Sequence, residues 1–326
     1  MTKQGILICG HGSRDQDGIQ AFEEMVSKVR HRHSDIVVEH GFLEFAHPTF
    51  DVAVDKIYQQ GVRDIVAIPA ILFPGGHLKN DMPYETNTLQ SLYPDLRIRF
   101  GKHLGICPQL LTLSRRLIEE TEAAHGFVDR KDTCLLVVGR GTSDPDANSD
   151  VAKLARMLWE GMGFGFATTA FIGVTYPLLK DGLPMLEGLP FKRIITIPFF
   201  LFTGVLLKKI YSQIDAHRPD SGKELIYTRS FESDDLILDA LDERIVEVEK
   251  GNPNMNCQLC KYRTQIVGYE KDVGREQVGH HFHVRGSLDH GHTHDHTHAE
   301  GHGNILKQGH GHSHSHSHGG DRHPEH

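Results

Sequence analysis

The chain has 326 residues, of which 38% are hydrophobic and 24% charged, a composition typical of globular proteins and a length that suggests two domains with some excess. A formal net charge of -8 argues against a nucleic-acid-binding protein. Uninterrupted apolar runs of membrane-spanning length and a signal-peptide pattern are both missing from the sequence, so we expect a cytoplasmic protein without a membrane anchor.

Short apolar runs bounded by Gly, Pro and Asp alternate with amphipathic stretches through the first part of the chain. The runs are rich in β-branched and aromatic residues and predict strands at 5–9, 35–42, 64–73 and 96–100. The stretches repeat their apolar residues about every 3.6 positions and predict helices at 17–29, 52–58 and 110–118.

The same alternation follows in the second part. It predicts strands at 134–138, 166–172 and 193–200, helices beginning at Val151, Leu178 and Val205, and a closing helix at 234–250. Alternating strands and helices indicate an α/β fold with parallel sheets flanked by helices, in which ligands bind at the carboxyl ends of the strands. We therefore predict an N-terminal domain at 1–129, a C-terminal domain at 130–250, a linker at 251–279 and a tail at 280–326.

The two parts are copies of one another at a constant offset of 129 residues. The segment 8–13 (ICGHGS) returns at 137–142 (VVGRGT), 42–48 (FLEFAHP) returns at 171–177 (FIGVTYP), and 68–79 (IPAILFPGGHLK) returns at 197–208 (IPFFLFTGVLLK). The copies share glycines and prolines, which a common backbone requires. They differ in chemistry, because His11, Glu44, His47 and His77 of the first copy correspond to Arg140, Gly173, Tyr176 and Leu206 of the second.

Three of the first-copy residues suit a metal ion. His11, Glu44 and His77 each follow a predicted strand, so they converge at one edge of the predicted sheet. Two imidazoles suit Co(II), Ni(II), Fe(II) or Zn(II), and a single carboxylate leaves positions open for solvent or a substrate. His47 stands before a proline at a predicted turn, where a structural role is equally compatible with the sequence.

The GHGS turn, the glutamate after the second strand, the PGGHL segment and the duplication together resemble the long form of the sirohydrochlorin cobaltochelatases, which are class II tetrapyrrole chelatases. The resemblance covers about residues 4 to 262. It implies insertion of Co(II) into sirohydrochlorin during cobalamin biosynthesis without a nucleotide. By motif match it implies that His11 and His77 are the catalytic and metal-binding pair and that Glu44 is a further ligand or proton acceptor.

The chemistry of metallation agrees with these residues. A macrocycle must lose two pyrrole protons while the metal sheds water, and neutral imidazole can both accept protons and hold a metal weakly near neutral pH. A substrate with many carboxylates also needs polar and cationic groups around the site. The candidates beside the motif turns are Ser13, Arg14, Lys79, Arg140, Lys208 and Lys209. Arg140 stands out because it replaces the active histidine in the second copy.

A Met-x-Cys-x-x-Cys motif with Cys257 and Cys260 follows the second copy. The family resemblance associates this motif with an iron–sulfur cluster. Because two thiolates cannot supply the four protein ligands that a cluster normally has, either two chains share one cluster as a homodimer, other ligands contribute, or the pair is a redox or passive thiol pair.

Residues 280–326 hold 16 of the 25 histidines and few apolar residues. Such a segment cannot bury enough apolar surface to fold alone, so we expect a disordered tail. Its alternating imidazoles can chelate divalent ions, and we predict metal storage or delivery to the chelatase site, with a solubilising tail as the alternative.

Other functions remain open at this stage. A ferrochelatase or a nickel chelatase acting on the same ring would need the same ligands. A metallochaperone or metal buffer would account for the tail, but it would not need paired histidines at equivalent strand ends. A phosphate-handling hydrolase or mutase is disfavoured because neither a phosphate-binding glycine motif nor an arginine cluster is present.

Overall fold

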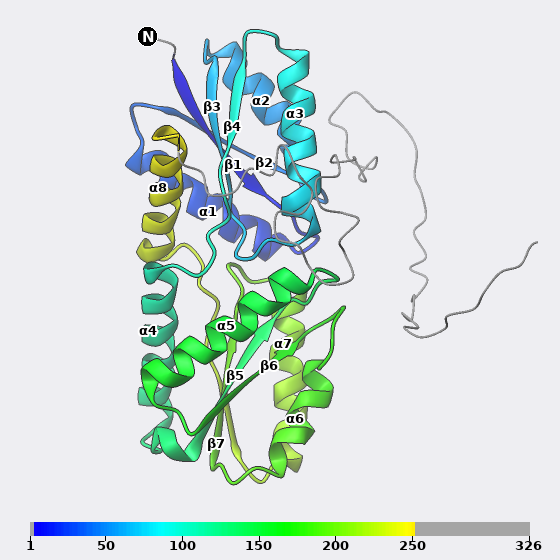
Figure 1. Ribbon diagram of the computed structural model, residues 1–326, viewed down its shortest axis with the longest axis vertical. Coiled ribbons are helices and arrows are strands. Elements are labelled where there is room, and N and C mark those ends of the chain that lie inside the picture. The colour runs from blue at the N-terminus through cyan, green and yellow to red at the C-terminus, as the bar shows by residue number, and fades with distance from the viewer. Residues whose placement is uncertain (1–2, 252–326) are drawn as a thin grey trace, which may run out of the picture. The chain divides into compact units, whose positions relative to one another are not determined.

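The computed structural model describes residues 3–251, and its first sheet contains four parallel strands (Figure 1). These are β1 (Gln4–Gly10), β2 (Val37–Phe42), β3 (Asp64–Pro69) and β4 (Arg97–Phe100), in the spatial order β2-β1-β3-β4. The three longer strands are buried along nearly their whole length, as expected for a parallel sheet covered on both faces.

The second sheet repeats this arrangement. It contains β5 (Thr133–Gly139), β6 (Phe166–Phe171), β7 (Arg193–Pro198) and β8 (Glu224–Tyr227) in the order β6-β5-β7-β8, again all parallel. The register agrees with the sequence repeat, because Asp64 pairs with Arg97 in the first sheet and Arg193 pairs with Glu224 in the second. Duplicated α/β halves with parallel sheets are therefore confirmed.

Helices cover both faces of each sheet. Around the first sheet lie α1 (Gln16–Arg32), α2 (Phe50–Gln59), the π-helical turn η1 (His77–Asp81) and α3 (Met82–Leu92). Around the second lie α5 (Pro145–Met162), α6 (Leu179–Glu187) and α7 (Val205–His217), with short 3-10 turns η2 (Arg130–Asp132) and η3 (Arg218–Asp220). Asp15 and Asp144 cap α1 and α5 at equivalent positions, each accepting a hydrogen bond from a first-turn backbone N–H.

Two helices pack against the sheet of the other copy. Helix α4 (Pro108–His125) follows β4 but packs against β7, β8 and α5, whereas α8 (Asp235–Glu249) follows β8 but packs against β3 and α1 (Figure 1). The two helices also contact each other, and one hydrophobic core contains residues of both. A boundary at 129/130 thus separates the two sheets along the chain, but it does not separate the helices that cover them.

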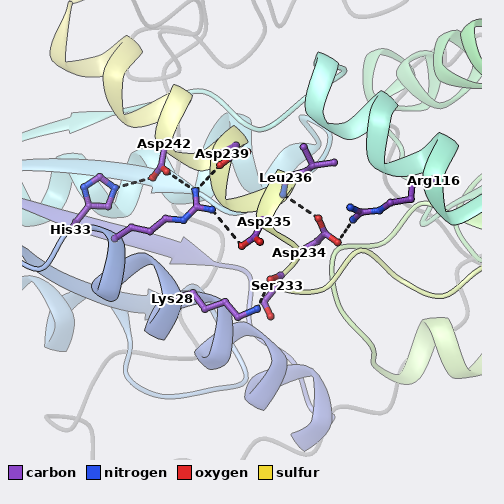
Figure 2. Close-up of polar contacts among 10 residues, drawn as sticks. Lys28, His33, Arg116, Ser233, Asp234, Asp235, Leu236, Asp239 and Asp242 are labelled. Carbon is purple, nitrogen blue, oxygen red and sulfur yellow. Dashed lines mark hydrogen bonds and ion pairs between the residues drawn. The ribbon is translucent and has the colours of Figure 1, made fainter.

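Polar contacts hold the start of α8 between α1 and α4 (Figure 2). Lys28 of α1 donates to the backbone oxygen of Ser233 at 2.8 Å, and Nε2 of His33 lies 2.8 Å from Oδ1 of Asp242. From the other side, Arg116 of α4 pairs with Asp234, the N-cap residue of α8. These contacts make the exchange of helices a specific arrangement.

Several predicted element bounds were wrong. The predicted strands 64–73 and 193–200 end at Pro69 and Pro198, and the chain then leaves each sheet toward the site-forming loops. The helix predicted from Val151 begins at Pro145, because Asp144 caps it and proline suits the first helical turn. Helix α3 and strand β8 were not predicted. Within residues 3–251, no helix has the length and apolar character needed to cross a membrane.

Candidate metal site

His11, Glu44 and His77 come together at the carboxyl edge of the first sheet. His11 directly follows β1, Glu44 lies in the loop after β2, and His77 is the first residue of η1 after β3. Their ligand atoms all lie within 4.8 Å of one another, and no other group of at least three such residues among 3–251 is close enough to hold a metal ion. The predicted convergence of these three residues is therefore present in the structure.

The backbone brings the first two loops into direct contact. The N–H of Glu44 donates to the carbonyl oxygen of His11 at 3.0 Å, and Gly12 lies between them with a φ of +95°. A Cβ at Gly12 would stand only 1.7 Å from the carbonyl oxygen of Glu44, so this position requires glycine. The glycine of the GHGS motif thus allows His11 and Glu44 to approach each other.

The side chains of the cluster are close but remain accessible. Nε2 of His11 lies 3.3 Å from Oε1 of Glu44, and the rings of His11 and His77 meet edge to face with centroids 4.4 Å apart. Glu44 is buried, while both histidines keep partial contact with solvent. A metal ion held here would retain open coordination positions for water or a substrate.

Hydrogen bonds orient both imidazoles in the same way. Nδ1 of His11 lies 3.1 Å from the carbonyl oxygen of Gly12, and Nδ1 of His77 lies 2.9 Å from Oδ2 of Asp81. Because a carbonyl and an ionised carboxylate only accept hydrogen bonds, these contacts favour the tautomer with the proton on Nδ1 and a lone pair on Nε2. In that tautomer Nε2 of His11 and the Glu44 carboxylate are both acceptors, and a cation between them would be stabilised.

Arg140 approaches the same cluster from the second copy. Desolvation lowers the pKa of Arg140, and the nearby carboxylate of Glu44 raises it, so the two groups interact electrostatically. The side chain of Arg140 is nevertheless solvent-exposed. A cation therefore stands beside the cluster where the second copy has lost the histidine.

Lys79 and Lys208 have carboxylate partners in the opposite copy. Nζ of Lys79 donates to Asp144 at 2.7 Å and to Asp146 at 2.8 Å. In the symmetric contact, Nζ of Lys208 donates to Asp15 at 2.8 Å and to Asp17 at 2.7 Å. We predicted these lysines as substrate-binding residues, but the structure uses both to join the two copies.

The remaining predicted residues lie around the GHGS turn. Oγ of Ser13 accepts from the backbone N–H of Asp15 at 3.0 Å, which shapes the turn into α1. The guanidinium of Arg14 lies over the ring of Phe45, 4.6 Å from its centroid. His47 is exposed and has no role in the metal cluster that the structure shows.

Sequence reasoning missed two features of this region. Phe45, beside Glu44, is 44% exposed and adopts a φ of +63°, a rare conformation for a bulky residue that is often found at functional sites. Asp81, the buried partner of His77, was also missed. Comparison of the copies contained a signal for it, because the second copy has Ile210 at the position of Asp81. Cys257, Cys260 and the histidines of 280–326 lie outside the described residues.

The fold and the cluster together define a two-copy α/β protein with a His/His/Glu metal site in its first copy. The chain belongs to the CbiX family, whose model matches residues 5–121 and 134–248. The two matched segments correspond to the two copies of the repeat.

Individual relatives agree with this family. The chain is 33% identical over 280 residues to a sirohydrochlorin cobaltochelatase of Priestia megaterium, covering 85% of this chain and 88% of the relative. It is 28% identical over 217 residues to a sirohydrochlorin ferrochelatase of the same organism, covering 66% and 80%. Among solved structures, SirB from Bacillus subtilis with Fe3+ matches with a TM-score of 0.68 and 26% identity, covering 77% of this chain and 99% of that one.

Proposed function

We propose that this protein inserts Co(II) into sirohydrochlorin without the help of a nucleotide, a step of cobalamin biosynthesis. The observation that carries the proposal is the cluster of His11, Glu44 and His77, which offers three ligand atoms within 4.8 Å of one another. Cobalt is favoured over iron because the cobaltochelatase relative is more similar than the ferrochelatase relative and matches more of the chain.

The reaction exchanges one divalent ion for two protons. The metal binds one face of the ring and forms bonds to its nitrogens, while two N–H bonds break and their protons pass to bases. Nε2 of His11 and Nε2 of His77 hold the incoming ion and are the groups placed to accept a proton once it has left them. Glu44 neutralises the ion's charge and passes protons toward solvent.

The substrate's carboxylates and its flat ring need different partners. Lys79 and Lys208 already bind carboxylates of the opposite copy, so Arg140 and Arg14 are the better candidates for the substrate's carboxylates. Phe45 and its counterpart in the second copy, Val174, are both exposed and both adopt a positive φ beside the strand ends. These apolar side chains are suited to contact the face of a macrocycle.

The other predictions from sequence are kept as part of the proposal. They are an iron–sulfur cluster at Cys257 and Cys260, metal binding by residues 280–326, a homodimer that would let two chains share a cluster, and a cytoplasmic location. Each rests on the sequence patterns and the family resemblance described above.

Metallation of sirohydrochlorin by the purified chain tests the proposal. Co(II), Fe(II) and Ni(II) are compared at equal free concentrations under anaerobic conditions, with and without ATP, by following the absorbance change of the ring. We expect Co(II) to be inserted fastest and ATP to have no effect. Faster insertion of Fe(II) or Ni(II) would assign the protein to that metal, and rates equal to the uncatalysed reaction for all three would overturn the proposal.

A further inference from the structure

His77 is held by a small buried network on its own helical turn. Nδ1 of His77 lies 2.9 Å from Oδ2 of Asp81, and the amide of Asn80 donates to Oδ1 of Asp81 at 2.6 Å. Asp81 is only 6% exposed and Asn80 only 2%. A hydrogen bond thus reaches each oxygen of this buried carboxylate, and one of the two comes from the metal-site histidine.

The second copy shows what the same position holds when no histidine is present. At the offset of 129 residues, His77, Asn80 and Asp81 correspond to Leu206, Lys209 and Ile210. Ile210 is fully buried in the apolar core beside the second sheet. The fold therefore accepts an apolar residue at this position, and burying a carboxylate there costs free energy unless it has partners. Histidine and aspartate occur together in one copy and are absent together from the other.

The local backbone also differs between the copies. In the first copy the backbone N–H of Met82 bonds to the carbonyl oxygen of His77, the i to i+5 pattern of a π-helix, and this turn spans His77 to Asp81. In the second copy the corresponding segment belongs to the α-helix α7. The offset between paired residues falls from 129 at Lys79/Lys208 to 127 at Arg97/Glu224, so the first copy has extra residues after the shared lysine. Wide turns of this kind are often found at functional sites.

We propose that Asp81 is a positioning residue that fixes the metal-binding orientation of His77, with Asn80 holding Asp81 in place. The inference deepens the proposed function and rests on it, because it concerns the ion that His77 delivers. By accepting the Nδ1 proton, Asp81 leaves the Nε2 lone pair directed to the cluster and prevents the ring from rotating away. Carboxylates in this position orient metal-binding histidines, and losing them typically weakens metal binding by about 10- to 100-fold.

The test uses Co(II) alone with the full chain. Co(II) is titrated while unfolding is followed, and the concentration at which the ion begins to stabilise the fold reports the affinity of the folded site. The variants are Asp81→Asn, Asp81→Ile, which installs the residue of the second copy, and His77→Ala. Residues 280–326 are common to all variants, so differences between them isolate the site.

A matched control is Asp64→Asn. Asp64 is a largely buried carboxylate at the opposite end of β3, where it pairs with Arg97 and Arg99. The substitution makes the same chemical change away from the cluster. It should lower stability without moving the Co(II) concentration at which stabilisation begins.

We expect Asp81→Asn and Asp81→Ile to raise that concentration about 10- to 100-fold. In the His77→Ala background, Asp81→Asn should have no further effect. In metallation assays, the KM for Co(II) should rise while the KM for sirohydrochlorin stays unchanged. If Asp81→Ile does not fold, Asp81→Asn carries the same test.

The outcomes separate this inference from the proposed function. A wild-type chain that responds to Co(II) no better than His77→Ala would remove the metal site itself and with it the proposed function. A wild type that responds better than His77→Ala, but no better than Asp81→Asn, would overturn the positioning role alone. An equal effect of Asp81→Asn with and without His77 would likewise contradict it.

Discussion

Replacing Lys79 with methionine removes a buried cation from the contact between the two copies. The side chain of Lys79 is 8% exposed and that of its partner Asp144 is 3% exposed. The equivalent contact of Lys208 has the same geometry, but the lysine is 50% exposed. The repeat thus supplies two chemically matched ion pairs that differ in burial.

The expected magnitude follows from this difference. Methionine keeps most of the length of Lys79 but leaves Asp144 buried without its cation, and breaking a buried ion pair in this way typically costs about 3–5 kcal/mol. That is a large share of the roughly 5–15 kcal/mol that stabilises a typical protein. Lys208→Met should cost far less, because exposed ion pairs are screened by water.

Urea unfolding measured by circular dichroism compares the two variants. A third variant, Lys79→Met with Asp144→Asn, removes the uncompensated charge, while asparagine can still cap α5. We expect Lys79→Met to lower the unfolding midpoint strongly, Lys208→Met to lower it little, and the double variant to recover much of the loss. Equal midpoints for Lys79→Met and Lys208→Met, or a double variant less stable than Lys79→Met, would refute the reasoning.

Three further predictions concern pH, substrate and tail. Burial, and then the charge of Arg30, lower the pKa of His40 to about 4 from 6.5. At about 1.4 kcal/mol per unit, roughly 3 kcal/mol of unfolding free energy should be present above pH 6.5 and lost as the pH falls toward 4, and His40→Gln should flatten this dependence in urea titrations at each pH. Arg140→Ala should raise the KM for sirohydrochlorin about 10- to 100-fold, as expected for a lost charged hydrogen bond, without changing the KM for Co(II), whereas Arg218→Ala at the far end of α7 should change neither. Deleting residues 280–326 should leave metallation intact at high Co(II) and slow it when Co(II) is scarce; equal slowing at all concentrations would contradict metal delivery by the tail.

The sheets and the site edge could be predicted because they depend on short-range patterns. Buried strands such as β1 and β5 are apolar along their length, and the sequence repeat identified which loops correspond. Parallel strands bring their carboxyl ends to one edge, so placing His11, Glu44 and His77 after successive strands was enough to bring them together.

The exchange of α4 and α8 could not be predicted from the same patterns. Both helices carry an ordinary apolar face, with residues such as Leu113 and Leu241, that fits either sheet equally well. The choice is made by the crossing segments and by long-range contacts such as Arg116 to Asp234. Sequence periodicity contains no information about such pairings.

The functions of the two conserved lysines of the repeat were missed for a related reason. Lys79 and Lys208 were considered only as cations beside the motif turns. Their partners Asp144 and Asp15 also occur at the offset of 129 residues, so a comparison of shared charges contained the signal. Asp81 needed the opposite comparison, because it marks a place where the copies differ.

The most direct test of the account is metallation of sirohydrochlorin with Co(II) by the wild type and by the His11→Ala/His77→Ala double variant. Because the variant lacks both imidazoles that hold the ion and accept protons, we predict a rate at least about 100-fold lower, near the uncatalysed rate, with unchanged circular dichroism. A folded double variant that still inserts Co(II) at the wild-type rate would contradict the assignment of the chemistry to this cluster.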